Sequence, residues 1–163
     1  MNRGNLRAKG EMLIRRPISE VYEAFVNPEI TTKFWFTKSS GRLEEGKWVE
    51  WTWDMYDVSV RVRVKEAETN RRILIEWGNP GELTEVEWTF TPVTDDTTFV
   101  SITNFGFQGS DDEIVTKALD SMGGFMIVLA GAKAWLEHNI KLNLVADRFP
   151  EGLRRHETEK IKR

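Results

Sequence analysis

The order of the hydrophobic patterns along the chain is the feature that most constrains its fold. A short amphipathic segment comes early, alternating apolar and polar residues fill the middle, and a helix-period stretch runs from Ser110 to about Ala146. A run of strands followed by one dominant helix predicts an antiparallel sheet that needs a cover for its apolar face. If the sheet curls around that helix, the space between them forms a cavity.

The first part of the chain predicts a strand and two short helices. The strand is expected over residues 10–16, because the proline that follows cannot donate to a ladder. Ser19 suits the N-cap of the first helix, and Asn27-Pro28 separates it from a second helix over residues 29–34. Two short helices in tandem form a bracket at one end of a sheet.

Five segments in the middle of the chain alternate with period two, as half-buried strands do. One face of each carries, in order, Val49, Trp51, Trp53 and Met55; Val58, Val60, Val62 and Val64; Ile73, Ile75 and Trp77; Thr84, Val86, Trp88 and Phe90; and Thr98, Val100, Ile102 and Asn104. Turn signals recur between these segments at hairpin intervals. We therefore expect an α+β protein with an antiparallel sheet that has one solvated face.

The long helix begins at a strong start signal, Ser110 followed by three acidic residues. Its apolar stripe consists of Ile114, Ala118, Met122, Phe125, Leu129, Ala132, Leu136 and Ile140. Gly123, Gly124 and Gly131 interrupt the helix, each at a cost of up to ~1 kcal/mol relative to alanine. We expect a close approach of the sheet or of a ligand to compensate, or a kink.

Length and charge limit the classes of protein. The 163 residues predict one domain over residues 1–147 and a charged, solvated tail over residues 148–163. The formal charge of −3 gives no field that would attract nucleic acid, and acidic residues interrupt the basic ones of the tail. The N-terminus has no apolar signal region, and no later segment approaches the ~20 apolar residues of a membrane span. We expect a cytoplasmic protein without membrane insertion.

The residues that carry catalytic or metal chemistry are scarce. The chain has no cysteine, and its two histidines, His138 and His156, have no carboxylates at ligand spacing, so no metal and no cofactor are expected. The candidates for acid–base chemistry are Glu50, Asp54, Asp57, Glu76 and Glu87, and by alternation nearly all of them fall on the solvated face. No catalytic residue is assigned, and enzyme activity is only weakly supported.

The layout and several local motifs resemble the START-like (SRPBCC, Bet v 1-like) superfamily. Within it the chain is similar to the bacterial family related to the C-terminal domain of the activator of heat shock protein 90 ATPase. The motifs are Ile18–Phe25, Asn27-Pro28-Glu29, Phe34-Trp35-Phe36, Gly106-Phe107 and Gly131–Leu136, within a resemblance over residues 8–146. The resemblance implies a helix-grip fold, in which a curved antiparallel sheet of about seven strands surrounds the long C-terminal helix. As one possible function it implies an interaction that activates a chaperone.

The aromatic residues predict a ligand site between sheet and helix. The candidate binding residues are Trp35, Trp51, Trp53, Trp77, Trp88, Phe90, Asn104, Met122, Phe125 and Leu129. Each ring can also simply fill the core, and Asn104 is either a polar anchor for a ligand or a satisfied amide at a strand end. As a set they favour non-catalytic binding of a small hydrophobic or aromatic molecule that is lipid-, flavonoid- or polyketide-like.

Two alternatives stay open, a protein that activates a chaperone ATPase and a cyclase- or hydrolase-like enzyme. The first predicts an exposed ring among Phe34, Trp35 and Phe36, because successive helical side chains diverge by about 100°. We expect Phe36 to be the most exposed of the three and Trp35 to be buried against the long helix. The sequence leaves the oligomeric state unknown.

Overall fold

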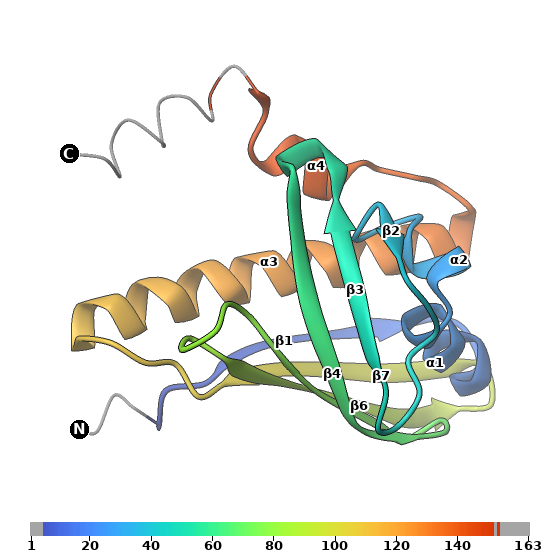
Figure 1. The fold of residues 1–163 in the computed structure, drawn as a ribbon. Helices are drawn as coiled ribbons and strands as arrows, with labels where there is room; N and C mark the ends of the chain where they lie inside the picture. The colour runs from blue at the N-terminus through green and yellow to red at the C-terminus, as the bar shows by residue number, and fades with distance from the viewer. Residues whose placement is uncertain (1–4, 152, 154–163) are drawn as a thin grey trace.

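A seven-stranded antiparallel sheet curls around the long helix α3 (Asp111–His138) in the computed structural model, which describes residues 5–151 and 153 (Figure 1). The strands are β1 (Ala8–Ile14), β2 (Lys38–Ser39), β3 (Trp48–Trp53), β4 (Val58–Glu68), β5 (Arg72–Trp77), β6 (Thr84–Thr94) and β7 (Thr97–Phe105). Their order across the sheet is β1-β7-β6-β5-β4-β3-β2, so every neighbouring pair but β1-β7 is also consecutive in sequence. The predicted α+β fold with a gripped helix is confirmed.

The short helices close one end of the sheet. Helix α1 (Ile18–Val26) begins directly after Pro17, and α2 (Pro28–Thr31) is capped by the Asn27 side chain, which accepts the Glu29 N–H at 3.1 Å. The predicted cap at Ser19 is therefore wrong, because the fixed backbone of the proline already sets the helix start. A short 3-10 turn, η2 (Asp54–Tyr56), joins β3 to β4.

Helix α3 ends earlier than its apolar spacing predicts. It stops at His138, because Asn139 adopts a left-handed conformation and its N–H bonds back to the carbonyls of Ala134 and Trp135. The chain then turns back and forms α4 (Leu144–Arg148), which lies against α3 near the tips of β3 and β4 (Figure 1). The expected continuous helix to Ala146 is thus two helices joined by a turn.

Helix α3 is long and apolar enough, by length and composition, to cross a membrane. The expectation that no segment reaches that apolarity is wrong in this respect. The core helix of a globular domain meets the same criteria. Helix α3 is such a core helix, because Phe125, Leu129 and Ala132 are buried under the sheet. The cytoplasmic location stays a prediction.

A largely buried carboxylate ties the end of β1 to the C-terminal part of α3. The Glu137 side chain is 10% exposed, and its Oε2 accepts the Arg15 N–H at 2.9 Å and the Lys133 ammonium at 2.6 Å. Lys133 also donates to the Leu13 carbonyl at 2.8 Å. Burial raises the pKa of Glu137, but these hydrogen bonds outweigh it and hold the pKa below its ordinary value.

We expect Glu137→Gln to lower the free energy of unfolding by about 1–3 kcal/mol at pH 7, because a charged hydrogen-bond acceptor is lost. A carboxyl with a lowered pKa contributes stability above its unfolded pKa, near 4.3, and loses it as the pH falls through the folded pKa. The difference between the two proteins in urea titrations should therefore shrink below about pH 4. The control is Glu44→Gln at an exposed loop position, and an equal loss there would contradict this account.

Candidate functional site

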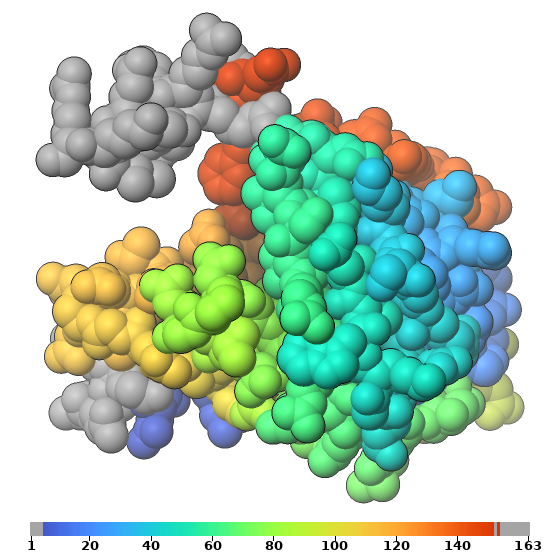
Figure 2. All heavy atoms as spheres, in the orientation of Figure 1, coloured from blue at the N-terminus to red at the C-terminus, as the bar shows by residue number. Residues whose placement is uncertain are grey.

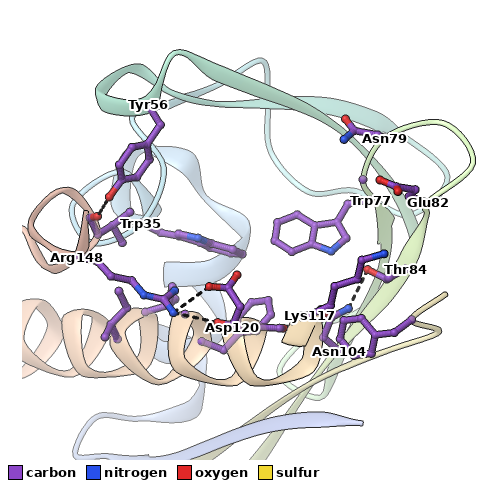
Figure 3. Close-up of a pocket in the computed structure, with 18 of the residues that line it drawn as sticks. Trp35, Tyr56, Trp77, Asn79, Glu82, Thr84, Asn104, Lys117, Asp120 and Arg148 are labelled. Atoms are coloured by element: carbon purple, nitrogen blue, oxygen red, sulfur yellow. Dashed lines mark hydrogen bonds and ion pairs between the residues drawn. The ribbon is translucent and has the colours of Figure 1, made fainter. Parts of the chain in front are cut away.

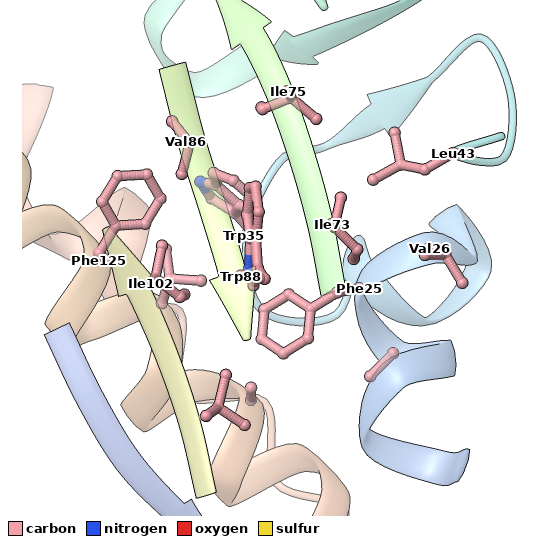
Figure 4. Packing of buried hydrophobic residues seen from close by; sticks show 14 of the residues in the cluster. Phe25, Val26, Trp35, Leu43, Ile73, Ile75, Val86, Trp88, Ile102 and Phe125 are labelled. Carbon is pink, nitrogen blue, oxygen red and sulfur yellow. The ribbon is translucent and has the colours of Figure 1, made fainter. Parts of the chain in front are cut away.

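The indole of Trp35 lies at the centre of a cluster of aromatic rings between the sheet and α3 (Figure 4). Its ring centroid is 4.9 Å from Trp51, 5.9 Å from Trp88 and 5.8 Å from Phe125. These neighbours come from β3, β6 and α3, so one residue of the loop after α2 bridges both layers. The predicted burial of Trp35 against the long helix is confirmed.

The neighbouring rings of this loop are also buried. The exposed fractions are 8% for Phe34, 7% for Trp35 and 2% for Phe36, so the prediction that Phe36 is the most exposed is wrong. The reason is that α2 ends at Thr31 and the three rings lie in turn and extended backbone, which sends them to different partners. Phe34 packs on Phe25 at 5.5 Å, and Phe36 stacks on Trp51 at 4.8 Å.

A cavity of about 530 Å³ opens beside this cluster. Figure 2 shows it as a hollow between α3, the β5–β6 hairpin and the tips of β3 and β4. Six aromatic residues line it: Trp35, Tyr56, Trp77, Phe107, Phe125 and Phe149. Its polar lining consists of Asn79, Glu82, Thr84, Asn104, Gln108, Lys117, Asp120, Ser121 and Arg148. Figure 3 shows Asn79 and Glu82 on the side of the hairpin and Asp120 with Arg148 on the opposite side.

The structure separates the ten predicted binding residues into three groups. Four of them line the cavity, namely Trp35, Trp77, Asn104 and Phe125. Five are buried in the core and do not line it, namely Trp51, Trp53, Trp88, Phe90 and Leu129. Met122 is 42% exposed on the outer side of α3, so its assignment to the cavity is wrong.

The error at Met122 follows from helix geometry. Each step of four residues advances the side-chain direction by about 40°, so a stripe built from steps of four drifts around the helix. After Ala118 the inward direction therefore passes to Ser121, which lines the cavity, and Met122 turns toward solvent. The spacing of apolar residues alone does not show at which residue the buried face shifts from steps of four to a step of three.

Asn104 is a satisfied amide within the cavity wall. Its side chain is 3% exposed, and its Nδ2 donates to Thr84 Oγ1 at 2.9 Å and to the Glu85 carbonyl at 2.8 Å. Its Oδ1 accepts the Ser121 hydroxyl at 2.8 Å. Of the two interpretations left open by the sequence, the satisfied amide is the one observed. Asn104 affects the cavity by orienting the hydroxyl groups of Thr84 and Ser121.

The segment after α3 supplies cavity residues that the sequence did not reveal. Arg148, expected in a solvated tail, donates from Nη2 to the Asp120 side chain and carbonyl, both at 3.2 Å. Phe149 packs on the Tyr56 ring at 6.3 Å, and the Tyr56 hydroxyl donates to the Val145 carbonyl. The rest of the expected tail lies outside the described residues, except Pro150, Glu151 and Leu153.

The paired glycines of α3 make room for Arg148. A Cβ on Gly123 would lie 3.0 Å from Nη2 of Arg148, and one on Gly124 would lie 3.0 Å from Nη1. The guanidinium therefore rests directly on the helix backbone. A close approach is observed, but its partner is Arg148, whereas we expected the sheet or a ligand. The Gly123-Gly124 pair indicated that some group packs closely on the helix, because two adjacent glycines destabilise a helix interior. The sequence did not show that this group is Arg148.

We expect Gly124→Ala to raise the midpoint of thermal unfolding. Alanine favours a helix by up to ~1 kcal/mol, and only the mobile end of Arg148 has to move, with loss of an exposed ion pair worth roughly 0.2–1 kcal/mol. Gly131→Ala is the matched control on the same helix, and it should lower the midpoint. Its Cβ would meet the Cβ of Phe34 at 3.1 Å and the backbone there at 3.4 Å, which cannot move freely. Shifts of equal sign would contradict this explanation.

Comparisons with known proteins agree with the fold. Residues 15–150 match the family model described as Activator of Hsp90 ATPase homolog 1-like protein. Among solved structures, SSP2350 from Staphylococcus saprophyticus is 28% identical and superposes with a TM-score of 0.72, over 84% of this chain and 96% of that one. No match was found among curated proteins.

Two further structures share the fold at lower identity. DynU16, a protein in the dynemicin biosynthetic locus, is 18% identical with a TM-score of 0.70, over 83% of this chain and 48% of that one. PFC0360w, an HSP90 activator from Plasmodium falciparum, is 15% identical with a TM-score of 0.56, over 86% and 94% of the two chains. Since the family model covers most of the sequence and the helix-grip fold agrees with it, the chain belongs to the Activator of Hsp90 ATPase homolog 1-like family.

Proposed function

We propose that the protein binds a small, largely aromatic molecule in the cavity beside Trp35 and does not chemically change it. The observation that carries the proposal is the cavity itself, of about 530 Å³ and walled by six aromatic residues. Ligand pockets are typically about 300–1,000 Å³ and are lined mainly by apolar and aromatic side chains with a few polar groups. The size and the lining of this cavity both agree with that class of site.

The aromatic side chains that line the cavity are held in place by their neighbours before any ligand binds. The Trp77 ring is 6.1 Å from Trp35 and 6.0 Å from Phe125, and both of those partners are buried. A ligand ring that packs against Trp77 therefore meets a surface that loses little freedom on binding. Flat aromatic molecules gain most from such a surface, because ring pairs add to the free energy of simple burial.

The charged groups of the cavity do not favour an enzyme. Acid–base chemistry needs a titratable group forced into an apolar environment. Asp120 is paired with Arg148, Lys117 donates to the Gln108 carbonyl at 2.9 Å, and Glu82 is exposed at the mouth. A cyclase- or hydrolase-like activity is therefore the weaker alternative.

We expect Ile127→Phe to weaken binding of a neutral aromatic probe, 2-naphthylmethanol, by about tenfold or more, because the added ring occupies the cavity that Ile127 lines. Met122→Phe is the matched control, since Met122 lies on the same helix but is exposed outside the cavity. Titration calorimetry on both variants and on the parent protein measures the effect. Equal affinity in all three proteins would refute the proposal.

Activation of a chaperone is the second candidate, and the family match motivates it. The surface expected to carry it, an exposed ring among residues 34–36, is absent from the described structure because all three rings are buried. We therefore expect the ATP turnover of a bacterial heat shock protein 90 to stay unchanged at saturating concentrations of this protein. A clear stimulation of turnover would favour chaperone activation instead.

A further inference from the structure

The polar wall of the cavity has a fixed pattern of hydrogen-bond donors and acceptors, set by Asn104. Its amide contacts the Glu85 carbonyl, and a carbonyl oxygen can only accept a hydrogen bond. The NH₂ group must therefore face Glu85, which fixes the orientation of the amide. The Oδ1 atom then faces Ser121, whose hydroxyl has to donate to it.

The two hydroxyls beside Asn104 are left with opposite capacities. Thr84 Oγ1 accepts an N–H of Asn104, and within residues 5–151 and 153 its own proton has no hydrogen-bond acceptor. This proton is left to donate to a ligand, because Thr84 lines the cavity. Ser121 has used its proton on Asn104, so it offers a ligand only its lone pairs.

Lys117 adds positive charge to this wall. It lies one helical turn before Ser121 and lines the same cavity. Figure 3 shows Lys117 and Thr84 on the same side of the cavity. Its ammonium donates one proton to the Gln108 carbonyl at 2.9 Å and carries two more. Of the two carboxylates that line the cavity, Asp120 is paired with Arg148 and Glu82 is exposed at the mouth.

We infer that the ligand is a flat aromatic molecule that carries a carboxylate. The inference rests on the proposed function and names the chemical class of its ligand. The ring packs against Trp77 and Phe125, while the carboxylate accepts hydrogen bonds from Lys117 Nζ and Thr84 Oγ1. Asn104 is a positioning residue, because it turns the Thr84 proton toward the ligand. Charged hydrogen bonds of this kind are stronger than neutral ones, which gives the anion its advantage.

Three naphthalene probes of similar size test the inference by calorimetry at pH 7. They are 2-naphthoate, which is anionic, 2-naphthylmethanol, which is neutral, and 2-naphthylmethylammonium, which is cationic. We expect 2-naphthoate to bind about tenfold more tightly than the alcohol, and the ammonium to bind most weakly. Equal affinities for 2-naphthoate and the alcohol would overturn the inference and leave the proposed function standing. Absence of binding by all three would overturn both.

Two matched pairs of variants assign the preference to its residues. Lys117→Met should reduce the preference for 2-naphthoate over the alcohol to about onefold, whereas Lys47→Met, at an exposed position outside the cavity, should keep it. Thr84→Val removes the hydroxyl and should lower the preference several-fold, whereas Thr84→Ser retains the hydroxyl and should keep it. Circular dichroism establishes that each variant is folded. A preference that survives both Lys117→Met and Thr84→Val would contradict this assignment.

Discussion

The packing of Trp35 between the sheet and α3 is the contact on which the rest of the structure depends. Its ring centroid lies within 6.2 Å of six other rings, from its own loop, β3, β5, β6 and α3. The indole fills the closed half of the grip and holds the curled sheet away from the helix. Because Trp35 also lines the cavity, the same side chain completes the core and forms the floor of the candidate site. Gly131 makes room for this loop on α3, since a Cβ there would lie 3.1 Å from the Cβ of Phe34.

The periods and order of the hydrophobic residues predicted the sheet, the bracket of short helices and the long helix, because these depend on which faces are apolar. The family resemblance added that the sheet grips the helix. Together they were not enough to divide the rings between core and cavity. Trp51 and Trp77 both lie on inner faces, and only the curvature of the sheet places one in the closed half and the other at the opening. The break after His138 depends on one left-handed asparagine, and the contact of Arg148 with Gly123 joins segments far apart in sequence.

The cavity combines a rigid aromatic floor with a polar wall whose groups are oriented by the protein itself. Asn104 uses both of its amide N–H groups within the fold and accepts the Ser121 proton, and in doing so it determines what Thr84 and Ser121 can offer a ligand. Arg148 forms an ion pair with Asp120 on the side of the cavity opposite the β5–β6 hairpin. Lys117 is then the charged group of the polar wall that can bind a ligand. Such an arrangement suits recognition of one molecule by shape and by one polar group.

The binding of an aromatic molecule on the Trp35 floor is the central claim, and fluorine NMR of the protein labelled with 5-fluorotryptophan tests it most directly. Single Trp→Phe variants assign the signals of the seven tryptophans. On addition of 2-naphthoate we expect the signals of Trp77 and Trp35 to shift together, while that of Trp48, which is exposed on β3 away from the cavity, stays in place. A shift of Trp48 alone, or no shift of Trp77 at saturating probe, would contradict the claim.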